Sequence, residues 1–448
     1  MPNIRLVVGV IAVVGALLSG QTYAWADEPG PSPAQQWIDD VVPAPGLPPA
    51  ASPPERVLSP ELSALWNAVS ASPTGDPIFD RWPEDLAGRA PGEIVEWRDV
   101  TATAAPLVVV PIRRALLLKF RSSDSYGKPS FGTATLIVPA AEWTGAGSRP
   151  VVVNALPINS LGRTCTPSYA LAHGLHQKFS MGDLIPPTTA WAVQRGYAVL
   201  VPDHEGPRMA YGEPIVAGHA VLDAVRAVRH QLPVEFGESR FAVSGYSGGA
   251  IASYGAAMLL GEYAPELAPV VAGMSMGGLI TDYRAIAEKF NGNVASGILM
   301  AAGLAIAREH PQMLAHLNNL AQWVAISPIK DTCGDSNGPL GVLGLPIDVG
   351  LNVADPLRSD FIESYFEHVD LTTRKAVAPM YIYHGSLDFG VPIEQGLALQ
   401  RKQCELGVTV FHQPLFGEHI IGLFGGWPGS MAWIDARLRG EPAPNSCH

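Results

Sequence analysis

The stretch "FAVSGYSGGAIASYGAAMLL", residues 241–260, decides the fold. A short run of β-branched and aromatic residues leads through three glycines into a segment of small residues. Gly245-Tyr246-Ser247-Gly248-Gly249 suits a strand that turns abruptly into a helix, because a side chain on either flank of the serine would clash. The stretch therefore predicts a nucleophile elbow. Ser247 would be the attacking group, and the Gly248 N–H at the helix start would donate to a developing oxyanion.

A second Gly-x-Ser-x-Gly at residues 273–277 shows that the motif alone is weak. The chain after Gly278 enters a long interval instead of a helix of small residues. Methionines flank Ser275, which indicates a packed strand end facing that interval. We therefore expect Ser247, and not Ser275, to be the nucleophile.

Buried-type strands alternate with helical patterns on both sides of the opening stretch. An antiparallel pair is expected at residues 114–120 and 131–139. Further strands are expected at residues 150–156, 196–202, 240–245, 269–274, 379–385 and 407–413. Strand and helix in repeated alternation predict an α/β fold, with a mostly parallel central sheet and helices on both faces.

The interval 279–376 is far longer than a crossover between neighbouring strands needs. It contains an Ala/Leu-rich helical part and a glycine-rich apolar part. We expect it to form a helical cap, or lid, inserted over the carboxyl edge of the sheet. The core then consists of residues 61–278 and 377–448.

The N-terminus has the pattern of an export signal. Arg5 precedes an apolar run from Leu6 to Leu18, and Ala24-Trp25-Ala26 offers a cleavage site. This predicts a signal peptide over residues 1–26 and a secreted protein, with association with the cell envelope left open. A retained anchor is the alternative, although the run is short for a membrane span. The proline-rich segment 27–60 is expected to be extended and poorly packed.

The net charge and the cysteines argue against several classes of binding partner. The 448 residues carry a formal net charge of −12, which argues against nucleic acid and against a membrane held by basic residues. The four cysteines, an even count in an exported chain, favour two disulfides with three possible pairings. Their spacing does not suit zinc. The cysteines are Cys165, Cys333, Cys404 and Cys447.

A serine nucleophile needs a base and an orienting carboxylate, in the chain order Ser, Asp or Glu, His for this architecture. Asp388 follows a strand end, where a loop can project it over the sheet. His419 lies after the next strand, in an expected loop. Asp360 and Asp370 fall in the cap, where we expect solvated side chains. Asp388 and His419 are therefore the predicted acid and base.

The other polar clusters have plainer interpretations. His384 ends a strand and is expected to fix the loop that holds Asp388, while His412 lies in a strand and His219 and His230 in a helix. The adjacent residues 203–205 (Asp-His-Glu) cannot converge on one ion from an extended segment, so a polar turn is expected. The sequence predicts no metal.

Five motifs together resemble the secretory lipase family of actinobacteria and yeasts. They are "CTPSYALAHG" (165–174), "VPDHEGPRMAYGEPIVAGHAVLDAVRA" (201–227), "GYSGG" (245–249), "HGSLDFGVP" (384–392) and "AWIDARLRG" (432–440). The resemblance covers about residues 75–447 and keeps the motifs in order. It implies an α/β-hydrolase fold with a lid, hydrolysis of triacylglycerols or other carboxylic esters, and no cofactor.

The resemblance also assigns the site residue by residue. The family's nucleophile falls on Ser247, its acid on Asp388 and its base on His419. Its second oxyanion donor comes from an Asp-Ser pair, for which this chain has Asn159-Ser160. An amide donates without needing a protonated carboxyl group, so we hypothesise that this departure widens the working pH range.

The resemblance further implies the disulfides Cys165–Cys333, between sheet and cap, and Cys404–Cys447, at the C-terminus. The sequence as a whole predicts a secreted serine hydrolase, a triacylglycerol lipase or esterase, that acts through an acyl-enzyme on a lipid or other acyl ester at a lipid–water interface. Two alternatives stay open. One is an acyltransferase that uses the same triad on cell-envelope esters, and the other is a non-catalytic lipid-binding homologue.

Overall fold

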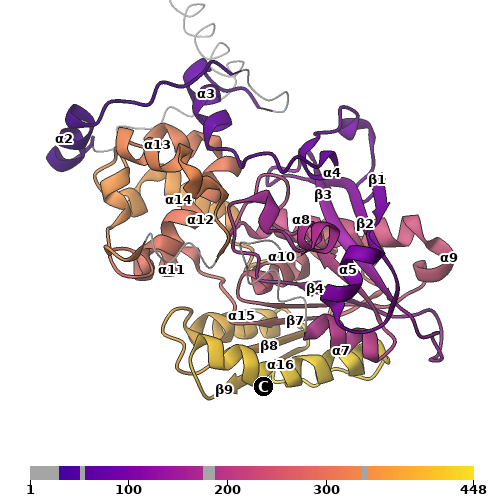
Figure 1. The fold of residues 1–448 in the computed structure, drawn as a ribbon. Coiled ribbons are helices and arrows are strands. Elements are labelled where there is room, and N and C mark those ends of the chain that lie inside the picture. The colour runs from indigo at the N-terminus through magenta and orange to yellow at the C-terminus, as the bar shows by residue number, and fades with distance from the viewer. Residues whose placement is uncertain (1–29, 51–55, 175–186, 335–340, 448) are drawn as a thin grey trace, which may run out of the picture.

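A nine-stranded sheet forms the centre of the described part of the protein (Figure 1). The computed structural model describes residues 30–50, 56–174, 187–334 and 341–447, so the predicted signal peptide lies outside it. The strands are β1 Ile94–Asp99, β2 Ile112–Ser123, β3 Pro129–Pro139, β4 Val151–Ala155, β5 Ala198–Pro202, β6 Phe241–Tyr246, β7 Val271–Gly277, β8 Met380–Gly385 and β9 Val410–Leu415.

The strand order is β1-β2-β3-β5-β4-β6-β7-β8-β9. The pairs from β1 to β5 are antiparallel, and those from β5 through β9 are parallel. The predicted mostly parallel sheet is therefore confirmed, and every expected strand is present. Strand β1 was not expected from the sequence.

Helices cover both faces of the sheet, as predicted. Helices α8, α10 and α15 bury side chains in the core of one face, and α5, α6, α7 and α16 do so on the other. The core helices are α4 Pro77–Asp80, α5 Thr101–Val108, α6 Pro167–His173, α7 Thr188–Gln194, α8 Pro214–Gln231, α9 Pro233–Phe236, α10 Gly248–Tyr263, α15 Ile393–Glu405 and α16 His419–Leu438. None of the helices in the described residues is long and apolar enough to span a membrane.

Small residues let α8 and α10 pack very closely under the sheet. A Cβ atom added to Gly218 would lie 2.5 Å from the backbone of Gly255, and one added to Gly255 would lie 2.0 Å from the Pro214 oxygen. The two helices therefore need glycine where they cross. This crossing fixes α10, the helix that follows Ser247.

The interval 279–376, called the cap below, connects the neighbouring parallel strands β7 and β8. Its described residues form helices, which Figure 1 shows grouped beside the sheet. The α-helices of the cap are α11 Tyr283–Phe290, α12 Ser296–Glu309, α13 Asn319–Ile326 and α14 Asp360–Val369.

The proline-rich segment 27–60 was expected to be extended, and that expectation is wrong for residues 33–41, whereas residues 42–50 form no helix or strand. Ser32 and Gln35 form a reciprocal capping box that starts α2 Pro33–Val41, and α3 Pro60–Val69 begins at the other end of the segment. Gln35 is buried, and its side chain donates to the carbonyls of Asp348 and Val353. Proline at the first helical position favours a helix start. The hydrogen bonds of Gln35 therefore hold α2 against the cap.

Two disulfides link distant parts of the chain. Cys165, just before α6, bonds Cys333 of the cap, and Cys404 of α15 bonds Cys447 near the C-terminus. The pairing is the one that the family resemblance implied. Each such bridge typically stabilises a protein by about 2–4 kcal/mol.

Candidate active site

Ser247 occupies a sharp turn between β6 and α10. Its φ and ψ are 53° and −118°, in a region that non-glycine residues rarely adopt. A Cβ atom on Gly245 would lie 2.0 Å from the Gly249 oxygen, and one on Gly249 would lie 2.0 Å from the Ala155 oxygen. The glycines are therefore required on both sides of the serine. This is the geometry that the opening stretch predicts.

A chain of hydrogen bonds joins the three residues singled out from the sequence. His419 Nε2 lies 3.0 Å from Ser247 Oγ, and His419 Nδ1 lies 2.6 Å from Asp388 Oδ2. The Asp388 side chain is fully buried, whereas His419 keeps 23% of its surface exposed. Segments after three parallel strands, β6, β8 and β9, thus bring these side chains together at one edge of the sheet.

His419 does not lie in a loop, contrary to the expectation. It is the first residue of α16, and Glu418 caps this helix by accepting from the N–H groups of Ile420 and Ile421. The Tyr246 hydroxyl donates to the His419 carbonyl, and the two rings lie 5.1 Å apart. The imidazole is therefore held by a helix start and an aromatic neighbour.

Asp388 lies in the loop after β8, as expected. Burial alone would raise the pKa of its carboxyl group. The side chains of His384 and His419 and the Val391 N–H favour the charged form, and they hold the pKa well below its usual value. His384 Nε2 also donates to the Val391 carbonyl at 2.7 Å, so this histidine braces the loop as expected. Asp388 is therefore a carboxylate at neutral pH.

Ser275 lies outside the chain of hydrogen bonds that joins Ser247, His419 and Asp388. It is fully buried within β7, and its hydroxyl lies 2.6 Å from that of Ser430 in α16. The expectation that it faces the cap is wrong, because its side chain points to the opposite face from the one where Met274 and Met276 join the core of α8 and α10. Its surroundings are those of a structural serine.

Asn159 lies directly against Gly248. A Cβ atom added to Gly248 would come within 1.8 Å of Asn159 Oδ1 and 3.5 Å of its Nδ2. Asn159 has a positive φ of 50°. The first backbone N–H groups of a helix have no partner within it, so the Gly248 N–H at the start of α10 is oriented outward. The two expected oxyanion donors are therefore neighbours.

Residues 203–205 form the expected turn, but their burial was not expected. The Ser160 N–H points at both carboxylate oxygens of Glu205 at 3.4 Å, and burial raises the Glu205 pKa well above its usual value. His204 Nε2 bonds to the Leu156 carbonyl at 2.7 Å, and burial lowers its pKa to about 4. The turn therefore supports the segment 156–160, which carries Asn159. The sequence signal was three ionisable residues directly after a buried strand.

An apolar cavity of about 340 Å³ lies largely within the cap. Side chains from all four cap helices line it, and the core contributes residues such as Leu161, Tyr211 and Ile251. The size and the apolar lining suit a ligand with a hydrocarbon part.

Known proteins resemble this chain both in sequence and in fold. The family model for secretory lipases matches residues 188–446. Lipase 10 of Candida albicans is 30% identical, with 86% of each chain covered. A protein of Mycobacterium tuberculosis named a probable inactive lipase is 27% identical, with 83% of each chain covered. Candida antarctica lipase A in its closed state superposes with a TM-score of 0.74 at 24% identity, over 84% of this chain and 89% of that one.

The rice cell wall degrading esterase LipA of Xanthomonas oryzae also shares the fold, with a TM-score of 0.57 at 14% identity over 79% of this chain and all of that one. The family model covers residues 188–446, which is more than half of the chain, and the similarity to Lipase 10 covers 86% of it. The chain therefore belongs to the secretory lipase family, a family of lipid-ester hydrolases with the α/β-hydrolase fold.

Proposed function

We propose that this protein is an exported serine hydrolase that cleaves carboxylic esters of lipids through an acyl-enzyme on Ser247. The observation that carries the proposal is the chain of hydrogen bonds from Ser247 Oγ through the His419 ring to Asp388. A nucleophile bonded to a base, which is in turn bonded to a carboxylate, is the arrangement that activates a serine.

Each residue has a definite step in this reaction. His419 Nε2 accepts the Ser247 proton as the serine oxygen bonds the ester carbonyl carbon, and Asp388 stabilises the imidazolium that forms. The Gly248 N–H and the Asn159 amide donate to the oxyanion. His419 then gives its proton to the departing alcohol. Water, deprotonated by His419, finally attacks the acyl-enzyme and releases the acid.

The cap cavity supports a substrate with a long acyl chain. Its apolar lining removes hydrocarbon from water, which contributes about 0.8 kcal/mol for each buried CH₂ group. We propose that the acyl chain occupies this cavity while the ester group lies at Ser247. A series of p-nitrophenyl esters should then show kcat/KM rising with chain length.

A fluorophosphonate probe tests the proposal directly, because it reacts much faster with an activated serine than with an ordinary hydroxyl group. We expect labelling of the peptide that contains Ser247. Absence of labelling would favour a non-catalytic lipid-binding protein, in line with the relative named a probable inactive lipase. Labelling at Ser275 would overturn the assigned nucleophile. Product analysis with and without an acceptor alcohol separates hydrolysis from acyl transfer.

Substitution of Asn159 should affect both rate and pH profile. Asn159→Ala should lower kcat by about 100- to 1000-fold with little change in KM, because one oxyanion donor is lost. Asn159→Asp restores a donor only while its carboxyl group is protonated, so its activity should fall as the pH rises. The pH–rate profile measures this, with Asn293→Asp at an exposed cap position as the control. An unchanged profile in Asn159→Asp would contradict the role of the amide.

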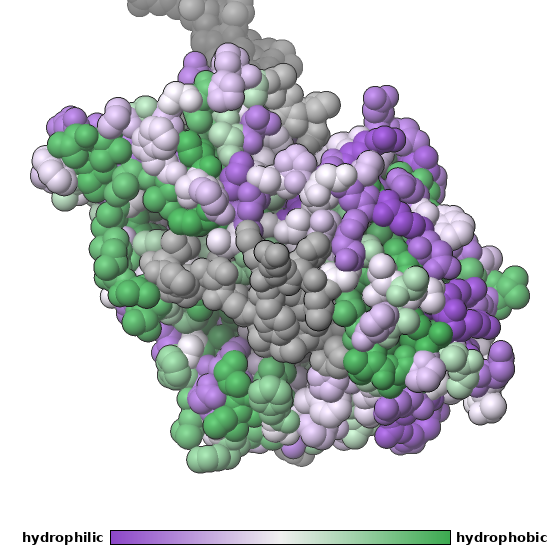
Figure 2. All heavy atoms as spheres, in the orientation of Figure 1, coloured by the Kyte–Doolittle hydropathy of each residue, from purple (hydrophilic) through white to green (hydrophobic). Residues whose placement is uncertain are grey.

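Large apolar side chains are exposed beside the proposed catalytic residues. Leu387 and Phe389 flank Asp388, and Phe416 and Phe424 lie near His419, with 57%, 76%, 84% and 67% exposure. Figure 2 shows hydrophobic residues gathered at the lower left, where β9 and α15 lie in Figure 1. Such a patch supports contact with a lipid–water interface.

Phe389→Ser combined with Phe424→Ser should weaken binding to a triacylglycerol emulsion by roughly 10-fold or more, because two apolar side chains no longer enter the lipid. Activity on a soluble short-chain ester should not change. Trp97→Ser is a matched control, since Trp97 is 52% exposed on β1 at the opposite edge of the sheet. Equal losses in control and double variant would remove the patch from the proposal.

A further inference from the structure

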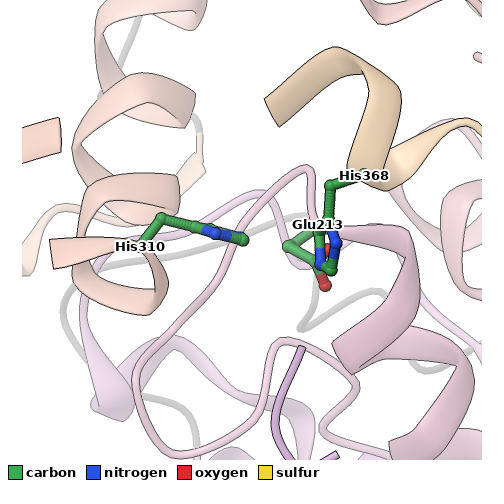
Figure 3. Close-up of side chains that lie close together, drawn as sticks. All are labelled: Glu213, His310 and His368. Atoms are coloured by element: carbon green, nitrogen blue, oxygen red, sulfur yellow. The ribbon is translucent and has the colours of Figure 1, made fainter. Parts of the chain in front are cut away.

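Three potential metal ligands meet where the cap touches the core (Figure 3). Glu213 precedes α8 in the core, His310 follows α12 in the cap, and His368 lies in α14. One carboxylate oxygen and one ring nitrogen of each histidine lie within 4.8 Å of one another. Figure 3 shows the His310 ring directed toward the other two side chains. None of the three takes part in the proposed reaction.

The His310 ring is arranged as metal-binding histidines are. It is only 5% exposed, and its Nδ1 lies 2.7 Å from the Tyr126 hydroxyl. Its Nε2 atom is buried and has no hydrogen-bond partner among the described residues. A histidine ligand typically donates one ring N–H to a neighbour and offers the other nitrogen to the metal. An unpartnered buried nitrogen is otherwise costly.

Glu213 is fully buried, and among the described residues no basic side chain forms an ion pair with it. Its oxygens accept from the Ser125 hydroxyl at 3.0 Å and from the Val216 N–H at 2.6 Å. The same Ser125 hydroxyl lies 2.8 Å from His368 Nε2, so it orients two of the three ligands. Burial raises the pKa of the Glu213 carboxyl group to about 8, so the group holds a proton at neutral pH, and a bound cation would take the place of that proton.

The positive side chains near the cluster are already paired. Arg56 contacts Asp124 at 2.9 Å and Glu309 at 3.2 Å, and Arg208 contacts Glu309 at 3.3 Å. Two arginines thus face two other carboxylates, and neither forms an ion pair with Glu213.

We propose that Glu213, His310 and His368 form a binding site for Zn²⁺ that fastens the cap to the core. Two imidazoles and a carboxylate are a common zinc ligand set, with water as the fourth ligand at tetrahedral geometry. Two nitrogen ligands disfavour Ca²⁺ and Mg²⁺, which select oxygen. In the zinc-bound site the three ligand atoms would lie about 2.0–2.2 Å from the ion, so they would have to be closer together than the 4.8 Å within which they lie here. Because the cap supplies two ligands, the complete site exists only while the cap is seated.

Titration of the metal-free, full-length mature protein with Zn²⁺ tests the site. We expect one strongly bound zinc per chain, measured by calorimetry and elemental analysis. Zn²⁺ should also raise Tm by a few degrees at about 100 times Kd, whereas Mg²⁺ and Ca²⁺ should not. Absence of tight Zn²⁺ binding would overturn the proposal.

Variants assign the binding to these residues. His310→Gln and His368→Gln should each weaken Zn²⁺ binding by at least about 100-fold and abolish the zinc-dependent rise in Tm. His316→Gln is the matched control, because His316 is a partly buried cap histidine that stacks on Phe361 outside the cluster. Wild-type zinc affinity in His368→Gln would overturn the assignment. This variant decides the matter even if His310→Gln does not fold, since His368 is only partly buried.

Discussion

Ser247→Ala should lower kcat on a p-nitrophenyl ester by about 10⁴- to 10⁶-fold. Serine and alanine both carry a Cβ atom, so the positive φ of 53° is equally strained in both, and the substitution removes only the hydroxyl. The hydrogen bond to His419 Nε2 is lost with it. The remaining activity would come from substrate binding and the oxyanion donors. Steady-state kinetics together with Tm separate loss of chemistry from loss of fold.

The second serine of the same motif is the control for this experiment. Ser275→Ala removes the buried contact with Ser430, which should cost about 1–3 kcal/mol of stability. Its kcat should stay at the wild-type value, because Ser275 contacts neither His419 nor Asp388 in the described structure. Loss of activity in Ser275→Ala with retention in Ser247→Ala would reverse the assignment.

The order of the chain predicts most of this arrangement. Buried strands in a parallel sheet end at one edge, so side chains that follow β6, β8 and β9 converge there whatever their distance in sequence. Ser247, Asp388 and His419 each follow one of these strands. Local patterns therefore identify the strands, and topology brings the three residues together.

Helix α16 shows why part of the site is not readable from local patterns. Its first half contains Gly422, Gly426 and Pro428, which favour a loop by propensity. The structure explains the glycines by packing, since a Cβ atom on Gly426 would lie 2.2 Å from the Tyr383 ring. Tertiary contact overrides propensity here, and it turns the expected loop around His419 into a helix start.

Local sequence patterns also do not predict burial that depends on contacts between distant segments. Residues 203–205 are predicted to form a polar turn, yet the Glu205 side chain is buried against the Ser160 N–H. The sequence pattern did not predict β1, because Glu96 and Arg98 interrupt the apolar residues of this edge strand. Contacts between segments that are distant in sequence determine both the burial of residues 203–205 and the pairing of β1. The local composition of these segments therefore does not predict either feature.

Asp388→Asn should lower kcat by about 10⁴-fold with little change in KM. The amide oxygen can still accept from the Gly390 and Val391 N–H groups, so the loop is expected to keep its shape. An amide cannot stabilise the imidazolium that forms when His419 accepts the Ser247 proton, and it no longer fixes the productive tautomer. Asp360→Asn, at an exposed position in α14, is the matched control and should retain full activity.

The difference in Tm between the wild type and Asp388→Asn should become smaller as the pH falls. The pKa of Asp388 is held well below its usual value, so its ionised form stabilises the fold at any pH above the pKa of a free aspartate, about 4. That contribution is lost as the pH falls toward the folded-state pKa. The Tm of Asp388→Asn should therefore lie below that of the wild type at pH 7, and the gap should narrow on acidification to about pH 3. A gap independent of pH would contradict a stabilising contribution from the ionised form of Asp388.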